Sequence, residues 1–157
     1  MNMHFLILFF PIIYYIMNML TLSTNYFMNP MPLTLIASLL VSQFFLGGVN
    51  KIRGFNKTVL GLQKTFNPSL PVWFYQLAIV NVILLELLAP VTVVMATMRK
   101  VKKEYAVLSL VLLAAFTVWA TYLYHFPPFG MTFYPFISNV SAVGGLLGFA
   151  VFLGQKL

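Results

Sequence analysis

Residues 72–98 read VWFYQLAIVNVILLELLAPVTVVMATM, an apolar run in which Glu86 is the only formal charge. At ~1.5 Å per residue, a helix of this length covers roughly 40 Å, which exceeds the ~30 Å thickness of a hydrocarbon core. Pro90 has no N–H to donate to the carbonyl of Glu86, so the helix is expected to tilt, kink or protrude. The run therefore predicts a transmembrane helix with an ionisable side chain near its centre.

Three further apolar runs have the length of a membrane span: residues 33–49, 105–124 and 136–153. The chain is 61% hydrophobic and only 7% charged, whereas about 25% of the residues of a soluble domain are charged. We therefore predict an all-α, polytopic transmembrane four-helix bundle. Its surroundings are the lipid bilayer, and the protein is expected to be an integral membrane protein.

An additional apolar segment, residues 4–22 (HFLILFFPIIYYIMNMLTL), precedes these runs. It lacks the basic n-region and the small-residue cleavage site that are typical of a secretory signal peptide. We therefore expect a retained extra helix, which either spans the bilayer or lies along its surface. The chain then divides into an N-terminal apolar helix with a polar linker, residues 1–32, and a membrane domain, residues 33–157.

The connector between the first two bundle helices has its own helical pattern. Phe55, Val59, Leu62 and Phe66 recur at the spacing of one helix face. This predicts a short amphipathic helix, which either lies in the headgroup region or covers the mouth of the bundle.

Nearly all of the net charge of +7 lies in this connector and in RKVKKE, residues 99–104. In a membrane protein such basic loops set the orientation and contact anionic lipid headgroups, rather than nucleic acid. We place RKVKKE on the cytoplasmic side or its equivalent.

Glu86 is the first candidate for a functional site, because intramembrane acids often mark proton or ligand pathways as well as structural contacts. No lysine or arginine at either end of its own helix comes within reach along the helix axis. We therefore expect neutral hydroxyl partners, Ser38, Thr117 or Thr121, and a carboxyl group that is protonated at neutral pH and donates one hydrogen bond.

Three other polar side chains are candidates within or beside the spans. Gln43 and Asn81 stand on helices that must run antiparallel, so they could meet and form a second polar level; we expect them to act mainly as interhelical contacts. His125 ends the fourth apolar run beside two prolines and several tyrosines. It is expected to anchor the helix at the membrane interface rather than to act as a catalytic base.

Small residues in the last apolar run predict close helix packing. Ser141 and Gly145 stand four residues apart, as do Gly144 and Gly148, so two narrow grooves line adjacent helix faces. Such grooves admit a neighbouring helix of the same chain or of a partner subunit. The glycines at positions 47–48 offer a similar close approach on the first bundle helix.

Four segments together resemble the DoxX and DoxX-like membrane proteins, over residues 33–153. They are FFLGGVNKIRGF (44–55), LLELLAPV (84–91), TYLYHFPPF (121–129) and SNVSAVGGLLGF (138–149). The resemblance implies a four-helix bundle in which Lys51, Glu86, His125 and Asn139 occupy the recurrent polar positions of the family. Residues 4–22 depart from the family pattern.

The resemblance implies a place beside other membrane proteins. Some members are similar to small subunits of thiosulfate:quinone oxidoreductase or accompany redox enzymes, and more remote relatives are cargo receptors or receptor-assembly chaperones. This chain has no cysteine and only two histidines, so thiol chemistry within it is excluded and no metal site is expected.

We therefore expect a non-catalytic accessory or scaffold subunit of a larger membrane assembly, with no required cofactor, docking through the N-terminal helix and the glycine grooves. The first alternative is a redox-associated protein with a quinone, lipid or small hydrophobic ligand in the bundle, Glu86 as proton acceptor and His125 near the mouth. The second is a membrane chaperone or cargo receptor, whose polar core recognises client helices.

Overall fold

The computed structural model describes residues 29–156, and four of the helices in this part are long and apolar enough to cross a membrane. The helices are α2 (Pro30–Arg53), α3 (Phe55–Phe66), α4 (Val72–Thr97), α5 (Lys103–His125), the short 3-10 helix η1 (Gly130–Thr132) and α6 (Phe133–Lys156). The predicted all-α polytopic bundle is therefore confirmed, and the protein is an integral membrane protein. The expectation for residues 4–22 lies outside the described residues.

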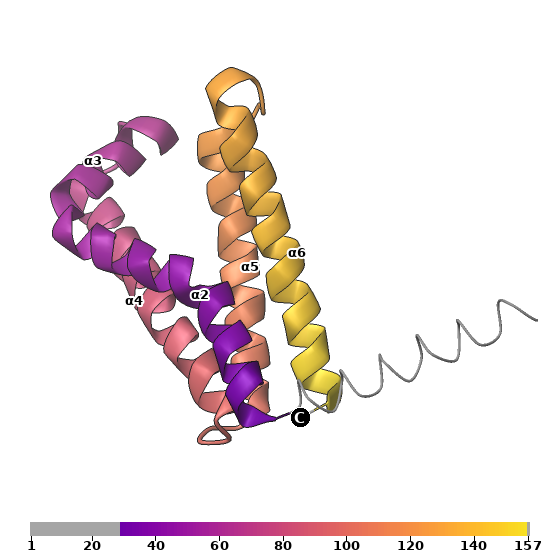
Figure 1. Cartoon of the computed structure of the whole chain (residues 1–157). Coiled ribbons are helices and arrows are strands. Elements are labelled where there is room, and N and C mark those ends of the chain that lie inside the picture. The colour runs from indigo at the N-terminus through magenta and orange to yellow at the C-terminus, as the bar shows by residue number, and fades with distance from the viewer. Residues whose placement is uncertain (1–28, 157) are drawn as a thin grey trace, which may run out of the picture.

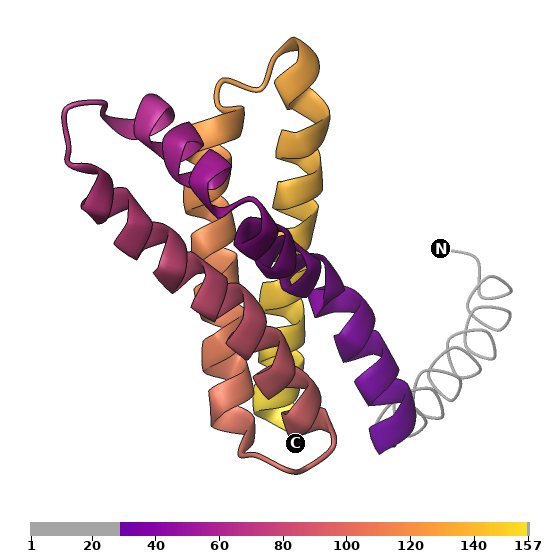
Figure 2. The same ribbon diagram turned by 90° about the vertical axis from the view of Figure 1, so that its left-hand side faces the viewer.

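The long helices are arranged as two pairs that share one end. Helix α2 packs along α4, and α5 packs along α6, while α4 and α5 join the two pairs. Figure 1 shows that the pairs converge at the connector between α4 and α5 and diverge towards α3. Figure 2, turned by 90°, shows α2 crossing α4 obliquely rather than running parallel to it. The polar residues of each pair therefore have different neighbours.

The larger core cluster lies where the pairs converge, and alanines supply much of its close packing. Ala37, Ala89, Ala96, Ala106 and Ala114 are all at most 4% exposed. Small side chains let helix backbones approach each other, which is the main source of packing attraction when the solvent is lipid. Leucines of α5 and α6 fill the remaining space in this cluster.

The smaller cluster explains the position of α3. Val59 of α3 is 3% exposed and packs with Tyr75, Ile79 and Ile83 of α4. The predicted amphipathic helix is confirmed, with the bounds Phe55–Phe66. Val59 and the partly buried Phe55 and Leu62 pack towards α4, whereas Phe66 is 48% exposed, so α3 covers the first turns of that helix.

Proline and an unusual backbone angle define the ends of α4. Pro71 precedes its first residue, and the helix continues through the buried Pro90 to Thr97. Arg99 has a φ of 59°, and the Lys100 N–H donates to the carbonyl of Met95 at 2.9 Å. This left-handed residue with a bond closing back over the last turn is a common helix stop, and it reverses the chain into α5.

A hydroxyl contact ties α2 to α4 at the converging end. The Oγ1 atoms of Thr34 and Thr97 lie 3.0 Å apart, and either could donate to the other. Each also lies within hydrogen-bond distance of a carbonyl of its own helix, at 2.6 and 2.7 Å, and Thr97 is 1% exposed. We expect Thr34→Val to lower the free energy of unfolding by about 0.6 kcal/mol, the typical value of an interhelical hydrogen bond in a membrane. Unfolding in mixed detergent micelles measures this.

The matched control is Thr92→Val, because the Thr92 hydroxyl donates only to the Leu88 carbonyl of its own helix. Equal losses in the two variants would contradict an interhelical contribution from Thr34.

Candidate functional site

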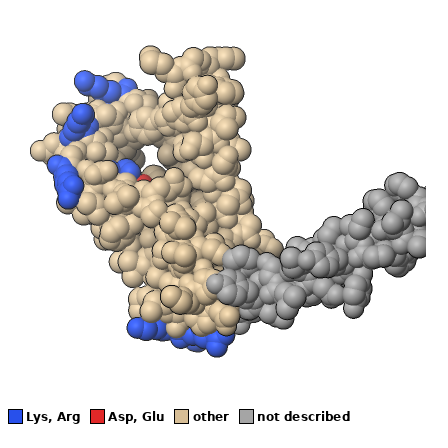
Figure 3. All heavy atoms as spheres, in the orientation of Figure 1, with Lys and Arg blue, Asp and Glu red and all other residues tan. Residues whose placement is uncertain are grey.

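The described residues form one salt bridge, and it joins α2 to α4. The Lys51 Nζ donates to both Glu86 oxygens, Oε1 and Oε2, at 2.8 Å each. The Glu86 side chain is 5% exposed and the Lys51 side chain is 26% exposed. Figure 3 shows an acidic and a basic side chain together at the edge of a hollow between the α2–α3 arm and α5–α6. The pair is therefore held mostly by protein and reaches this hollow through the lysine.

The expectation of neutral hydroxyl partners for Glu86 is wrong. The Ser38 hydroxyl donates to the Thr34 carbonyl at 2.7 Å. On α5, the Thr117 and Thr121 hydroxyls donate to carbonyls of their own helix, at 2.7 and 2.6 Å. Each hydroxyl proton is thus used locally, as is common for Ser and Thr in helices.

The cation that the prediction overlooked comes from the neighbouring helix. Helix α2 extends past Val49 to Arg53, so Lys51 stands on the helix rather than in a loop. Its long, flexible side chain reaches back along the protein surface to Glu86, as lysines near helix ends do. We expected a protonated Glu86 because no cation was predicted near it. Lys51 is such a cation, so that expectation has lost its basis.

Two glycines of α2 make room for the pair. A Cβ at Gly47 would stand 3.5 Å from Glu86 Oε2 and 3.6 Å from Lys51 Nζ. A Cβ at Gly48 would stand 3.1 Å from Leu87 Cγ and 3.2 Å from Glu86 Cβ, closer than an ordinary contact. The close approach predicted at positions 47–48 is confirmed, and it is here that α2 crosses α4.

The chemistry available to this pair is limited by its geometry. Both oxygens of the Glu86 carboxylate accept from one ammonium group, so the acid has a strong partner already in place. Attraction and hydrogen bonding offset the desolvation of such a pair only in part, but the loss of either partner leaves a buried charge without compensation. The arrangement is that of a structural link between two helices.

Gln43 and Asn81 do not form a second polar level. Both are exposed, and the Asn81 Nδ2 donates to the Leu77 carbonyl of its own helix at 2.8 Å. Because Gly48 lies beside Glu86, antiparallel helices place Gln43 beyond Glu86 and Asn81 before it. The two amides are thus separated by roughly 15 Å along the helices. The prediction compared the distance of each amide from the end of its own helix. It did not take into account which residues of α2 lie beside which residues of α4.

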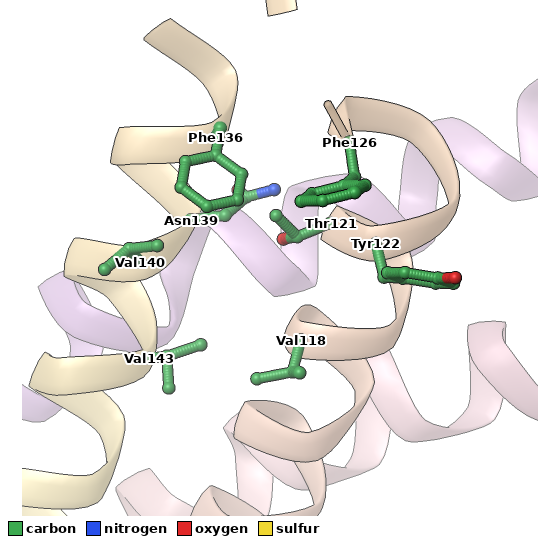
Figure 4. Close-up of a pocket in the computed structure, with 8 residues that line it drawn as sticks. All are labelled: Val118, Thr121, Tyr122, Phe126, Phe136, Asn139, Val140 and Val143. Atoms are coloured by element: carbon green, nitrogen blue, oxygen red, sulfur yellow. The ribbon is translucent and has the colours of Figure 1, made fainter. Parts of the chain in front are cut away.

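The remaining two polar positions of the family resemblance lie on the other helix pair. His125 is partly buried at the end of α5, and Asn139 is partly buried on α6. Asn139 lines a pocket of about 280 Å³ between α5 and α6, shown in Figure 4. The pocket's lining residues are Val118, Thr121, Tyr122, Phe126, Phe136, Asn139, Val140 and Val143. The four positions therefore form no single site: Lys51 joins Glu86, and Asn139 belongs to a separate pocket.

Sequence reasoning did not identify this pocket. The signal was present in the spacing of Val118, Tyr122 and Phe126 at successive helix turns, facing a similar stripe that includes Phe136 and Val140. Such stripes are also typical of lipid-facing surfaces, so the spacing alone does not distinguish a pocket from an outer face.

The two small-residue grooves of α6 have different surroundings. A Cβ at Gly145 would stand 3.1 Å from Leu40 Cδ1, so this groove faces α2 of the same chain. Gly144 and Gly148 have no neighbouring atom of the described residues within 4 Å of such a Cβ, and Ser141 is exposed. The Ser141–Gly145 groove therefore contacts α2 only at Gly145, and the Gly144–Gly148 groove is open on the surface.

Comparison of the chain with protein-family models, with curated proteins and with solved structures finds no match in any of the three. Among residues 29–156, no group of three or more His, Asp or Glu side chains could hold a metal ion. The function of this protein must therefore be inferred from its own structure.

Proposed function

We propose that the protein is a non-catalytic accessory subunit of the DoxX-like type, which packs against other proteins in a membrane-embedded assembly. The observation that supports this most directly is the exposure of two carboxamides, Gln43 and Asn81, on helices that span the membrane. Asn81 bonds only to a carbonyl of its own helix, and the amide donors and acceptors that remain without partners are costly in hydrocarbon, by several kcal/mol each. A neighbouring protein surface would supply those partners.

The open groove of α6 supports the same proposal from a different helix. The Gly144 and Gly148 positions leave backbone accessible on a spanning helix, and association of membrane helices relies on close backbone approach at small residues. A helix of another subunit seated in this groove would gain packing that lipid chains provide poorly.

The basic residues fit a role beside the bilayer surface as well. Figure 3 shows Lys and Arg side chains gathered at two ends of the molecule, over α3 and at the connector between α4 and α5. We expect both groups to contact anionic lipid headgroups, each lysine or arginine adding about 1 kcal/mol of attraction near such a surface.

Substitution of the open groove tests the accessory role. We expect Gly144→Leu to leave the fold intact but to separate the protein from its assembly. The bulky side chain blocks a partner, and its Cβ meets no atom of residues 29–156 within 4 Å. Purification in a mild detergent, with particle mass and subunit stoichiometry determined by mass spectrometry, measures this.

Gly61→Leu is the matched control, because a Cβ at Gly61 also meets no atom within 4 Å but lies on α3, outside the spanning helices. The native chain should purify with defined partners at fixed stoichiometry, and so should the Gly61 variant. A native particle that contains one copy of the chain and no other protein would contradict the proposal.

The redox alternative has less support from the geometry. Its proton acceptor, Glu86, is already bound by Lys51 through both oxygens, and His125 is not among the residues of the pocket between α5 and α6. The chaperone alternative predicts a varied set of clients below one per chain, which the same stoichiometry measurement separates from a fixed subunit.

A further inference from the structure

The pocket between α5 and α6 opens onto the outer surface of two membrane-spanning helices. It lies in the part of α5 just before His125 and in the first turns of α6, both within candidate membrane spans. Val118, Tyr122 and Val140 line it and are 56%, 61% and 52% exposed. A molecule dissolved in the lipid phase can therefore reach this pocket.

One polar group stands out in this apolar lining. Figure 4 shows the Asn139 side chain pointing from α6 towards Thr121, with the rings of Phe136 and Phe126 on either side. Residues 29–156 provide Asn139 with no hydrogen-bond partner, and the Thr121 hydroxyl donates its proton to the Thr117 carbonyl. The carboxamide thus has donor and acceptor capacity available inside an apolar site, where a hydrogen bond is strong and an unmade one is costly.

Size and lining restrict what fits. An apolar cavity of ~150 Å³ holds one benzene ring, so a pocket of about 280 Å³ matches a pair of fused rings. Aromatic side chains favour a flat partner, which they contact through stacked or edge-on rings. Tyr122 is already stacked on Phe126, with ring centroids 5.7 Å apart, so this wall is flat and preformed.

We propose that this pocket binds a membrane-soluble ring compound that carries a carbonyl or hydroxyl oxygen, with Asn139 as the hydrogen-bonding residue. The rings lie between Phe136 and Phe126, and the oxygen meets the Asn139 carboxamide. Lipid-soluble quinones share this chemistry, and so does the hydroxyl-bearing ring of a sterol, whose other rings would extend beyond a pocket of about 280 Å³. The inference is independent of the accessory role proposed above, because it concerns a different surface of the chain.

A matched pair of probes tests the assignment. 2-Acetylnaphthalene and 2-ethylnaphthalene have nearly the same size, but only the first has a carbonyl oxygen. The full chain is placed in lipid nanodiscs, and the probe retained in excess over empty nanodiscs is measured by chromatography. We expect the ketone to be retained more strongly, and Asn139→Leu to weaken its retention about tenfold, the loss expected for one hydrogen bond in an apolar site.

Three variants make the result specific. Asn139→Leu should leave the retention of 2-ethylnaphthalene unchanged, and Val143→Phe, which fills the pocket, should reduce the retention of both probes. Asn81→Leu, which removes an exposed amide elsewhere, should change neither. Retention of the ketone by the Asn139 variant within twofold of the native value overturns the proposal. So does the absence of excess ketone retention by the native chain, which would mean that acyl chains of the bilayer fill the pocket.

Competition distinguishes the natural sources of this chemistry. A benzoquinone with one isoprenoid unit and a sterol are each added against the bound ketone. Displacement by the quinone alone assigns the pocket to redox lipids, and displacement by the sterol alone assigns it to sterols. If neither compound displaces the ketone, the pocket accepts only small ring compounds, which have no isoprenoid tail and fewer than four fused rings.

Discussion

Lys51→Met should lower the free energy of unfolding by about 3 kcal/mol, the largest loss expected from a single change in the polar residues of this chain. The substitution removes the one cation that residues 29–156 place beside Glu86, whose side chain is 5% exposed. Removing one partner of a buried pair typically costs 3–5 kcal/mol, and the lower end applies because the Lys51 side chain is 26% exposed. Unfolding in mixed micelles of a mild detergent and dodecyl sulfate gives the value.

Glu86→Leu should cost less, because the lysine that remains can turn its ammonium group towards the interface. The double variant Lys51→Met with Glu86→Leu should recover most of the loss, since it leaves no buried charge without a partner. Lys57→Met is the control, because this exposed lysine belongs to α3. A coupling energy between Lys51 and Glu86 below about 0.5 kcal/mol, the size of an ordinary surface pair, would show that the contact is energetically unimportant.

Gly48→Leu should also destabilise the protein by about 3 kcal/mol, through packing rather than charge. At this position even a Cβ would stand 3.1 Å from Leu87 Cγ and 3.2 Å from Glu86 Cβ. The Leu87 side chain can move, since its Cδ2 atom is also 3.1 Å away, but Glu86 Cβ is attached directly to the α4 backbone. We therefore expect α2 and α4 to separate to admit the larger residue. Overpacking of this kind costs roughly 1–3 kcal/mol, and here it also pulls Lys51 away from Glu86.

The comparison with Gly144→Leu makes this prediction specific. The same substitution on α6 meets no described atom within 4 Å, and replacing glycine inside a helix by itself favours the helix by up to about 1 kcal/mol. The Gly144 variant should therefore unfold at the native denaturant concentration or above it. Equal destabilisation at both positions would mean that glycine matters for a general reason and that the crossing at Gly48 is not special.

The helices could be predicted from sequence because hydropathy alone determines which segments leave water. Residues 72–98 were predicted as one span, and the structure has Val72–Thr97. The end of α2 was placed too early, since Asn50 and Lys51 look like the start of a polar loop. A lysine near a helix end can stay helical while its charged group reaches a partner. The first polar residues after an apolar run therefore mark where the chain leaves the hydrocarbon core of the membrane, but the helix itself can continue further.

The contacts of the polar residues could not be predicted in the same way. Distance along one helix excludes partners on that helix, but it carries no information about a side chain that arrives from a neighbour at an oblique crossing. For Glu86, the useful signal was the glycine pair at 47–48, which marks where another backbone can approach. For Asn139, the pocket depends on the rotation of α6 against α5, and no residue pattern in a single helix specifies that rotation.

The salt bridge also affects how the protein is held against a charged membrane surface. In the folded chain Lys51 is drawn beneath the surface and its charge is offset by Glu86, so it adds little to the attraction between that end and acidic phospholipids. Apart from Lys51, the α3 end carries Arg53, Lys57 and Lys64, and the α4–α5 turn carries four basic residues of the segment 99–103 together with the acidic Glu104. The two ends thus have equal net charge, and a leaflet rich in phosphatidylserine or similar lipids should attract them about equally. One internal ion pair thereby evens out the charge that the two sides of the molecule present to the bilayer.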